Sequence, residues 1–342
     1  MIVGRTSLLG RLLLRRTLFA LFLVSSCGPT ALAQPGNLDF VTIGAAGNRA
    51  ANESEAPGLE GYPIGAVPYE YRLTRTEVTV TQWLSFARAY DPFRTGDVED
   101  PGLVGRFLRH NSSGYYAIPG TEQFPADMSW RYAAVFCNWL HNGQVSSADA
   151  FSRGAYDTST FTQNADGSLN DQVSRSPGAR FWIPSWDELT KGAYYDPNRY
   201  GNGADGFWTM PDGRNTPLIS GFPADGGETN AGIAFLHGMD VGQYPQINSP
   251  WGLLDVSGGA REWTETVDTP ASIRTRIVKG SVAGGTDAYI ALDRIDVRLV
   301  SGPNDSFIGL RLAAAVPGPG VPSGVLLGVL WICGKRRRTR RA

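Results

Sequence analysis

The order of apolar and polar residues predicts short strands and a few amphipathic helices, joined by long polar segments. Alternation of the two residue types is typical of half-buried strands. Strand-like segments occur at 38–43, 67–75, 181–183, 276–279 and 307–313. Apolar residues three and four positions apart predict helices at 82–90, at 131–140 and after Ser185. The stretches 91–124 and 142–178 show neither pattern, and we expect irregular structure there.

Polar residues at the expected helix starts support these predictions. Thr79 or Thr81 precedes the first helix and Ser129 the second, and a hydroxyl there accepts a hydrogen bond from a first-turn amide. Ser185 precedes the third helix, and Glu188 stands at the position that completes a capping box. Glu188 is therefore expected to stabilise a helix start rather than to take part in catalysis.

The stretch 249–268 combines an apolar run, a glycine turn and two acidic residues. Residues 251–256 are predicted to be strand-like, Gly258 and Gly259 allow the backbone to reverse, and Asp255 and Glu262 lie seven positions apart. Carboxylate and carbonyl oxygens in an irregular loop suit a hard cation such as calcium. An ordinary turn with solvated acids is the alternative, because the spacing does not match an EF-hand.

Residues 1–33 have the pattern of an export signal. Four arginines precede the apolar run 17–24, and Ala31-Leu32-Ala33 forms a small-x-small cleavage site. We expect cleavage after Ala33, and the alternative is a lipoprotein signal in which Cys27 is acylated. In both cases the protein is expected to leave the cytoplasm.

Residues 316–342 resemble the PEP-CTERM sorting signals of bacteria. A proline-containing linker, the apolar segment 321–334 and a cluster of six basic residues follow one another in the order of those signals. The resemblance implies processing by an exosortase-type membrane protease, although Gly318 stands where the signature glutamate belongs. The apolar segment is shorter than the roughly 20 residues of a membrane-spanning helix, and a plain C-terminal membrane anchor is the alternative.

Residues 34–315 are expected to form one domain between these ends. About 280 residues, in a chain that is 42% apolar, are enough for a substantial core. The ends hold ten of the 31 basic residues and none of the 32 acidic ones, so this domain carries a net charge near −11. Nucleic acid is not expected as a partner, since phosphate contacts need clustered Lys and Arg. Cys137, the domain's single cysteine, is predicted to be buried and allows no internal disulfide.

Six segments occur together in the order typical of one protein family. They are EVTVTQWLSF (77–86), FPADMSWRYAAVFCNWL (124–140), RFWIPSWDELTKGAYYDP (180–197), GLLDVSGGAREW (252–263), RIVKGS (276–281) and GLRLA (309–313). With these segments the chain resembles the formylglycine-generating, or sulfatase-modifying-factor, family over residues 39–313, and within it the exported bacterial branch. The resemblance implies an α+β fold, a loop-rich variant of the C-type lectin fold with bound calcium and little regular secondary structure.

The resemblance also implies a set of calcium ligands in the stretch 252–263. Gly259 stands where the family motif has an asparagine, and Arg261 where it has an aromatic or aliphatic residue. These changes affect the packing of the turn rather than its ligands. Matched by motif, the ligands are the side chains of Asp255 and Glu262 and the backbone carbonyls of Gly258 and Ala260.

Other metal sites of the family are expected to be incomplete. A second calcium site would begin near Asn230, with Asp240 as the nearest acid, and the loop between them is shortened. Catalytic members hold copper with two cysteines, five positions apart, after the strand that matches RIVKGS. Residues 281–290 contain no cysteine, and glycine and threonine cannot replace a thiolate pair, so copper is not expected. The three histidines are scattered and show no metal-binding spacing.

Three functions from different classes remain. The favoured one is a non-catalytic, calcium-stabilised module on or outside the cell, which binds a carbohydrate, a peptide or another surface protein. The second is an oxidoreductase of the formylglycine-generating type with altered chemistry, in which Ser281, Asp287 and Tyr289 line the substrate groove. The third is a structural matrix protein. A shared fold does not establish function, so the resemblance leaves all three open.

Overall fold

The computed structural model describes residues 37–59, 61–233, 238–269 and 272–317. The predicted export signal and nearly all of the predicted sorting signal lie outside these residues. Within them, the helices and strands are short and most of the chain forms turns and loops, as expected for a loop-rich α+β fold. No helix in this described part is long and apolar enough to cross a membrane.

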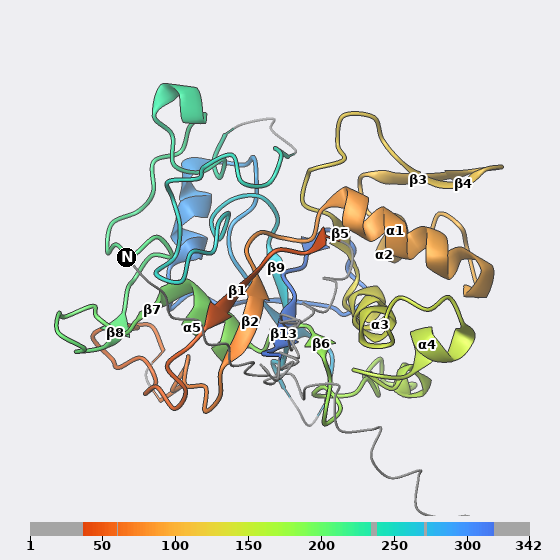
Figure 1. Cartoon of the computed structure of the whole chain (residues 1–342), viewed down its shortest axis with the longest axis horizontal. Coiled ribbons are helices and arrows are strands. Elements are labelled where there is room, and N and C mark those ends of the chain that lie inside the picture. The colour runs from red at the N-terminus through yellow and green to blue at the C-terminus, as the bar shows by residue number, and fades with distance from the viewer. Residues whose placement is uncertain (1–36, 60, 234–237, 270–271, 318–342) are drawn as a thin grey trace, which may run out of the picture. The chain divides into compact units, whose positions relative to one another are not determined.

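Two sheets form the centre of the domain (Figure 1). The first is antiparallel, in the order β1 (Phe40–Ile43), β2 (Tyr71–Thr74), β13 (Ala313–Ala315) and β6 (Phe181–Trp182). The second has the order β11 (Leu299–Ser301), β10 (Arg276–Lys279), β9 (Glu262–Val267), β12 (Ile308–Gly309) and β5 (Asp127–Met128), with β9 and β12 parallel. In the first sheet, strands from both ends of the domain therefore lie together. Two hairpins complete the strands: β3 (Leu108–Asn111) with β4 (Gly114–Ala117), and β7 (Tyr195–Asp196) with β8 (Gly206–Phe207).

In the described part of the chain five α-helices lie around the sheets, and Figure 1 shows α1 to α4 on one side of β1 and β2. Their bounds are α1 Val80–Tyr90, α2 Pro101–Val104, α3 Trp130–His141, α4 Ala148–Ser152 and α5 Trp186–Tyr194. The predicted caps of the three long helices are confirmed. Thr79 forms a capping box with Gln82, the Ser129 hydroxyl accepts from the third residue of α3, and Ser185 forms a capping box with Glu188. The described residues also include the short 3-10 helices η2 (Asp91–Phe93), η3 (Thr158–Thr160), η4 (Pro223–Asp225) and η5 (Asp287–Asp293).

Aromatic side chains hold α1 against α3. The ring of Phe136 lies 5.3 Å, between centroids, from the rings of both Trp83 and Phe86, and all three residues are buried. Aromatic pairs at this separation add to the stability that burial of apolar area supplies. Cys137 is fully buried on the same helix, and burial raises the pKa of its thiol well above the usual value. Its predicted role as a small core residue fits this position.

Two sequence-based predictions of local structure are wrong. The run 251–256 is not a strand, because Gly252 and Asp255 adopt positive φ angles of 85° and 53°, and the nearest strand, β9, begins only at Glu262. The stretches 91–124 and 142–178 are not wholly irregular, since the first contains α2 and the β3–β4 hairpin and the second contains α4. Those elements are too short for their apolar residues to establish a period. Packing of buried side chains such as Leu103 and Tyr115 stabilises them instead.

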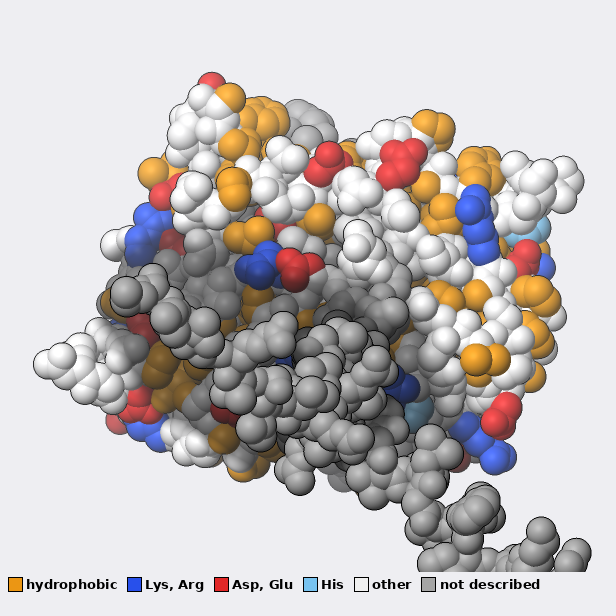
Figure 2. Space-filling model, in the orientation of Figure 1, with side chains coloured by type: hydrophobic (Ala, Val, Ile, Leu, Met, Phe, Trp, Pro, Cys, Tyr) orange, Lys and Arg blue, Asp and Glu red, His pale blue; other side chains and the backbone are white. Residues whose placement is uncertain are grey.

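The surface in Figure 2 mixes charged, polar and apolar side chains. Lys and Arg side chains are spread over the described part of that face, and several lie beside Asp or Glu. Fifteen ion pairs between an arginine and a carboxylate occur in the described residues, and the most deeply buried of them joins Arg311 to Glu262. This buried pair lies at the predicted calcium loop.

Candidate functional site

The predicted calcium loop lies between residue 255 and the start of β9. Asp255, Gly258 and Gly259 all have positive φ angles, of 53°, 84° and 57°. Aspartate and asparagine tolerate this left-handed region better than other residues with a Cβ, and glycine adopts it freely. A Cβ at Gly258 would lie 2.1 Å from the side-chain oxygen of Asn230. The glycine turn predicted from the sequence is therefore required by both backbone angle and space.

Three consecutive backbone amides fix this loop to three distant segments. Their acceptors are side-chain oxygens, so each amide points away from the loop toward a neighbouring segment. The hydrogen bonds run from Gly258 to Ser281 Oγ (2.8 Å), from Gly259 to Asn230 Oδ1 (2.8 Å) and from Ala260 to Glu77 Oε1 (3.1 Å). Anchoring of this kind holds the loop backbone in one conformation before any ligand arrives.

The two predicted carbonyl ligands remain available. The carbonyl of Gly259 accepts a hydrogen bond from the amide of Ala283, at 2.9 Å. In the described residues, the carbonyl oxygens of Gly258 and Ala260 accept no hydrogen bond. These two oxygens belong to the predicted calcium ligands, and calcium is coordinated by such backbone carbonyls together with carboxylates.

One arginine lies among three carboxylates at this loop. Glu77 and Glu262 are buried, Asp255 is partly buried, and Arg311 is fully buried. Arg311 donates to Glu262 Oε1 at 2.9 Å, and Glu262 Oε2 has only a long contact of 3.4 Å with Arg311 Nε. The other guanidinium hydrogen bonds of Arg311 go to backbone carbonyls of residues 74, 75 and 254. Its single positive charge therefore faces three acidic groups.

The acidic groups respond to burial and to one another. Burial raises the pKa of Glu77 well above its usual value, and the nearby charges of Asp255 and Glu262 raise it further, while Arg311 lowers it. Burial likewise raises the pKa of Asp255 and of Glu262. A buried carboxylate is costly unless it is paired, and one guanidinium cannot neutralise three. The loop therefore favours a further positive charge, either bound protons or a cation.

A small cavity joins the two predicted calcium sites. Asn230, Asp240, Asp255 and Gly259 are among the residues that line it, and its volume of about 10 Å³ is room for about one water-sized group. Asp240 itself is exposed at the rim of the loop. The residues predicted for a second calcium site thus converge on the first loop.

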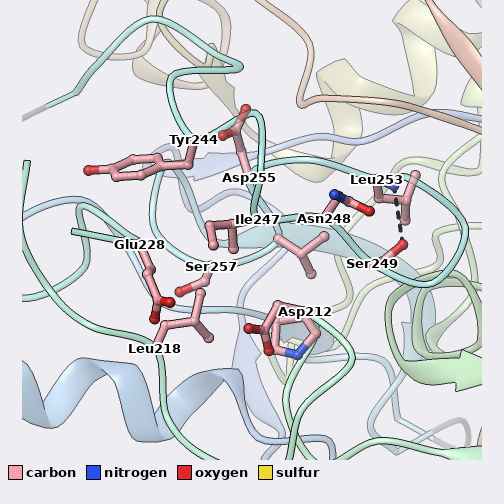
Figure 3. Close-up of a pocket in the computed structure, with 12 residues that line it drawn as sticks. Asp212, Leu218, Glu228, Tyr244, Ile247, Asn248, Ser249, Leu253, Asp255 and Ser257 are labelled. Carbon is pink, nitrogen blue, oxygen red and sulfur yellow. Dashed lines mark hydrogen bonds between the residues drawn. The ribbon is translucent and has the colours of Figure 1, made fainter. Parts of the chain in front are cut away.

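Asp255 also borders a second small cavity, which Figure 3 shows. Asp255 and Tyr244 lie on one side of this cavity, and Asp212 and Glu228 lie on the other (Figure 3). The Oδ2 atom of Asp255 accepts a hydrogen bond from the amide of Gly242 at 2.6 Å. The Asp255 side chain therefore lies between two small cavities and is held by the Gly242 amide, whereas an ordinary turn would leave it in solvent.

The donor set fits calcium and does not fit copper. All four predicted ligand groups offer oxygen, which hard cations prefer. In the described residues, no three His, Cys, Asp or Glu side chains lie close enough to hold a metal ion, so backbone carbonyls would have to complete the coordination. Cys137 is the free cysteine of this part of the chain, and it is buried in α3, so no thiolate pair is present there for copper.

The predicted substrate groove is only partly exposed. Ser281 is buried rather than lining a groove: its amide and hydroxyl both donate to Asp293, at 2.6 and 2.9 Å. Asp293 ends η5 and is itself fully buried, which raises its pKa to about 6. Tyr289 is 37% exposed. Asp287 is the first residue of η5. The η5 helix places Asp293 next to Ser281. The two hydrogen bonds between these residues leave Ser281 buried, so it does not line an open groove.

Two residues of the site were missed by sequence reasoning, although both lie within the family segments. Glu77 stands beside the apolar residues Val78 and Val80, and Arg311 stands between Leu310 and Leu312. A charged residue in an apolar, strand-like run needs a buried partner of opposite charge. That signal could have predicted a buried ion pair, but not which acids face Arg311.

A family model matches most of this chain. The family model of the sulfatase-modifying factor enzyme 1-like domain matches residues 45–316. No curated protein matches the sequence. Among solved structures, Treponema denticola variable protein 1 is similar, with 16% identity, a TM-score of 0.46, and coverage of 81% of this chain and 95% of that one. The loop-rich α+β fold predicted from the sequence is confirmed, and the chain belongs to the sulfatase-modifying factor enzyme 1-like domain family.

Proposed function

We propose that this protein is a non-catalytic, calcium-stabilised binding module that acts outside the cytoplasm. The observation that carries the proposal is the contrast between two neighbouring segments. The loop at 255–262 keeps its acidic and carbonyl oxygens in place, whereas the segment after β10 offers no thiol. The scaffold is thus retained and the groups for copper-dependent oxidation are not.

The segment after β10 is built for a tight turn rather than for metal chemistry. Gly284 is buried and Gly285 exposed, with φ angles of 88° and 79°, and η5 follows at once. Cysteines at these positions would need a side chain where the backbone favours glycine. Formylglycine generation by a thiolate-bound copper is therefore not supported by this chain.

Calcium would stabilise the loop by balancing charge. When bound, it would supply two positive charges to the side chains of Asp255 and Glu262 and to the carbonyls of Gly258 and Ala260. The chain itself holds the loop in place through the amide hydrogen bonds to Ser281, Asn230 and Glu77. The proposed role of calcium is structural.

An open cavity beside η5 is the most suitable place for a ligand. Its volume is about 480 Å³, within the range of small-molecule and peptide side-chain sites. Apolar side chains of Met210, Leu218, Ile219 and Ile290 line it, and Arg294 adds a charged group at its edge. We propose that an exported carbohydrate, peptide or surface protein binds here. The sequence of the two chain ends supports export, and processing by an exosortase-type protease is part of the same proposal.

Removal of calcium is expected to lower the melting temperature of the purified protein. A ligand that binds only the folded state stabilises it by about 2.7 kcal/mol when its free concentration is a hundred times the dissociation constant. Differential scanning calorimetry in about 10 mM calcium, roughly a hundred times a dissociation constant of about 10⁻⁴ M at the tight end of the range for extracellular calcium-binding modules, is compared with excess chelator. An unchanged melting temperature would contradict the calcium assignment, and the same scans with magnesium serve as the control.

The protein is expected to leave a sulfatase-type cysteine peptide unchanged. Incubation with copper and oxygen should produce no loss of the peptide thiol to formylglycine, because no thiolate pair is present in the described chain to hold Cu(I). Mass spectrometry of the peptide measures the outcome, with a peptide that lacks the cysteine as control. Enzyme-dependent turnover would overturn the non-catalytic proposal and favour an oxidoreductase with altered chemistry.

A further inference from the structure

Glu77 carries a buried carboxylate oxygen that has no protein partner. Its Oε1 atom accepts the hydrogen bond from the amide of Ala260, but Oε2 is buried and unpaired in the described structure. The side chain is 1% exposed, and its charge lies near those of Asp255 and Glu262. A buried, half-satisfied carboxylate beside two others is an expensive arrangement in a protein that needs only a stable turn.

Gly259 provides the space that Glu77 occupies. A Cβ at position 259 would lie 2.1 Å from Glu77 Oε1 and 3.4 Å from Pro125. Any other residue at position 259 would therefore push the Glu77 carboxylate away from the loop. The Glu77 carboxylate can therefore reach the loop only because residue 259 is a glycine.

Glu77 reaches the loop from a distant part of the chain. It precedes α1 and lies 183 positions before Ala260, whose amide it accepts. This bond fixes the N–H of the peptide group between Gly259 and Ala260. The carbonyl oxygen of the same peptide group, that of Gly259, accepts a hydrogen bond from the amide of Ala283. The orientation of that peptide sets the direction of the next carbonyl, that of Ala260, which is one of the proposed ligands.

We propose that Glu77 is a positioning residue that sets the calcium affinity of the loop. Oε1 holds the peptide that orients the Ala260 carbonyl, and the negative charge of the carboxylate favours a cation beside Asp255 and Glu262. This inference rests on the proposed calcium site. Glu77 acts through the loop and its charge, since the described structure contains no group of three acids close enough to hold an ion by themselves.

The test compares the wild-type protein with Glu77→Gln. Glutamine has the same shape and keeps an oxygen for the Ala260 amide, but it removes the charge. We expect the calcium dissociation constant, measured by isothermal titration calorimetry, to rise about 10- to 100-fold, as for other residues that support metal ligands. In chelator, the melting temperature of Glu77→Gln is expected to be unchanged or higher, because glutamine keeps the hydrogen bond to the Ala260 amide without the cost of a buried acid.

A matched control is Glu265→Gln, which removes a buried acid from β9, only three residues beyond Glu262. Glu265 accepts hydrogen bonds from Tyr156 and Arg175, outside the calcium loop. The Glu265→Gln substitution is therefore expected to leave the calcium dissociation constant unchanged. If Glu77→Gln lowers the melting temperature equally with and without calcium and leaves the dissociation constant unchanged, Glu77 is only structural and the inference is wrong. If wild type binds no calcium at all, the proposed calcium site itself fails.

Discussion

Replacement of Arg311 by methionine is expected to lower the free energy of unfolding by about 3–5 kcal/mol, the range for breaking a buried ion pair. The guanidinium is fully buried and is the charge partner of Glu262. Methionine would leave that carboxylate, together with Glu77 and Asp255, without a compensating charge. It would also remove the hydrogen bonds to the carbonyls of residues 74, 75 and 254. Denaturant titration of the purified variants measures the change.

The control for this prediction is Arg274→Met. Arg274 forms an exposed ion pair with Asp166 at 3.6 Å, and such surface pairs contribute about 0–1 kcal/mol. Arg311→Lys keeps the charge but loses the planar fork, so its loss should lie between the two. A loss for Arg311→Met no larger than that for Arg274→Met would show that the buried cluster does not depend on the arginine.

The acidity of Glu265 is expected to make stability depend on pH between about 4.5 and 7. Burial raises the pKa of Glu265 to about 7, and Glu188 adds to this effect against the opposing charge of Arg175. The unfolded chain releases this proton at its ordinary pKa, so in this window the folded state binds more protons. The free energy of unfolding therefore falls as pH rises from 4.5 to 7. A shift of this size corresponds to about 3 kcal/mol.

The measurement is a series of denaturant titrations from pH 4.5 to 7.5 on wild type and Glu265→Gln. Glutamine does not titrate, so the difference between the two proteins isolates Glu265 from the other acids. We expect the stability of wild type relative to the variant to decline by about 3 kcal/mol over this range. A difference that is constant with pH would mean that Glu265 has an ordinary pKa despite its burial.

The helices could be predicted from the sequence because their signals are local. A cap and an apolar period lie within about ten residues, and the structure places Thr79, Ser129 and Ser185 at helix starts as expected. The hairpin β3–β4 and the helix α2 could not be predicted in this way. Each of these three elements is only four residues long and is stabilised by contacts with distant segments. The run 251–256 misled for the opposite reason. Its apolar residues are buried or partly buried in a loop conformation, since Gly252 and Asp255 turn the backbone.

The sequence by itself determined the family, the loop-rich α+β fold and the absence of cysteines after β10. It also determined the glycine turn and the two acids of the 255–262 loop, because these are contiguous residues with local conformational requirements. Only the tertiary structure decided that Glu77 and Arg311 join that loop, that Asn230 and Asp240 converge on it, and that Ser281 is buried beneath Asp293. The physical reason is that charge balance and burial depend on which distant segments meet. Local sequence patterns do not show which distant segments come into contact.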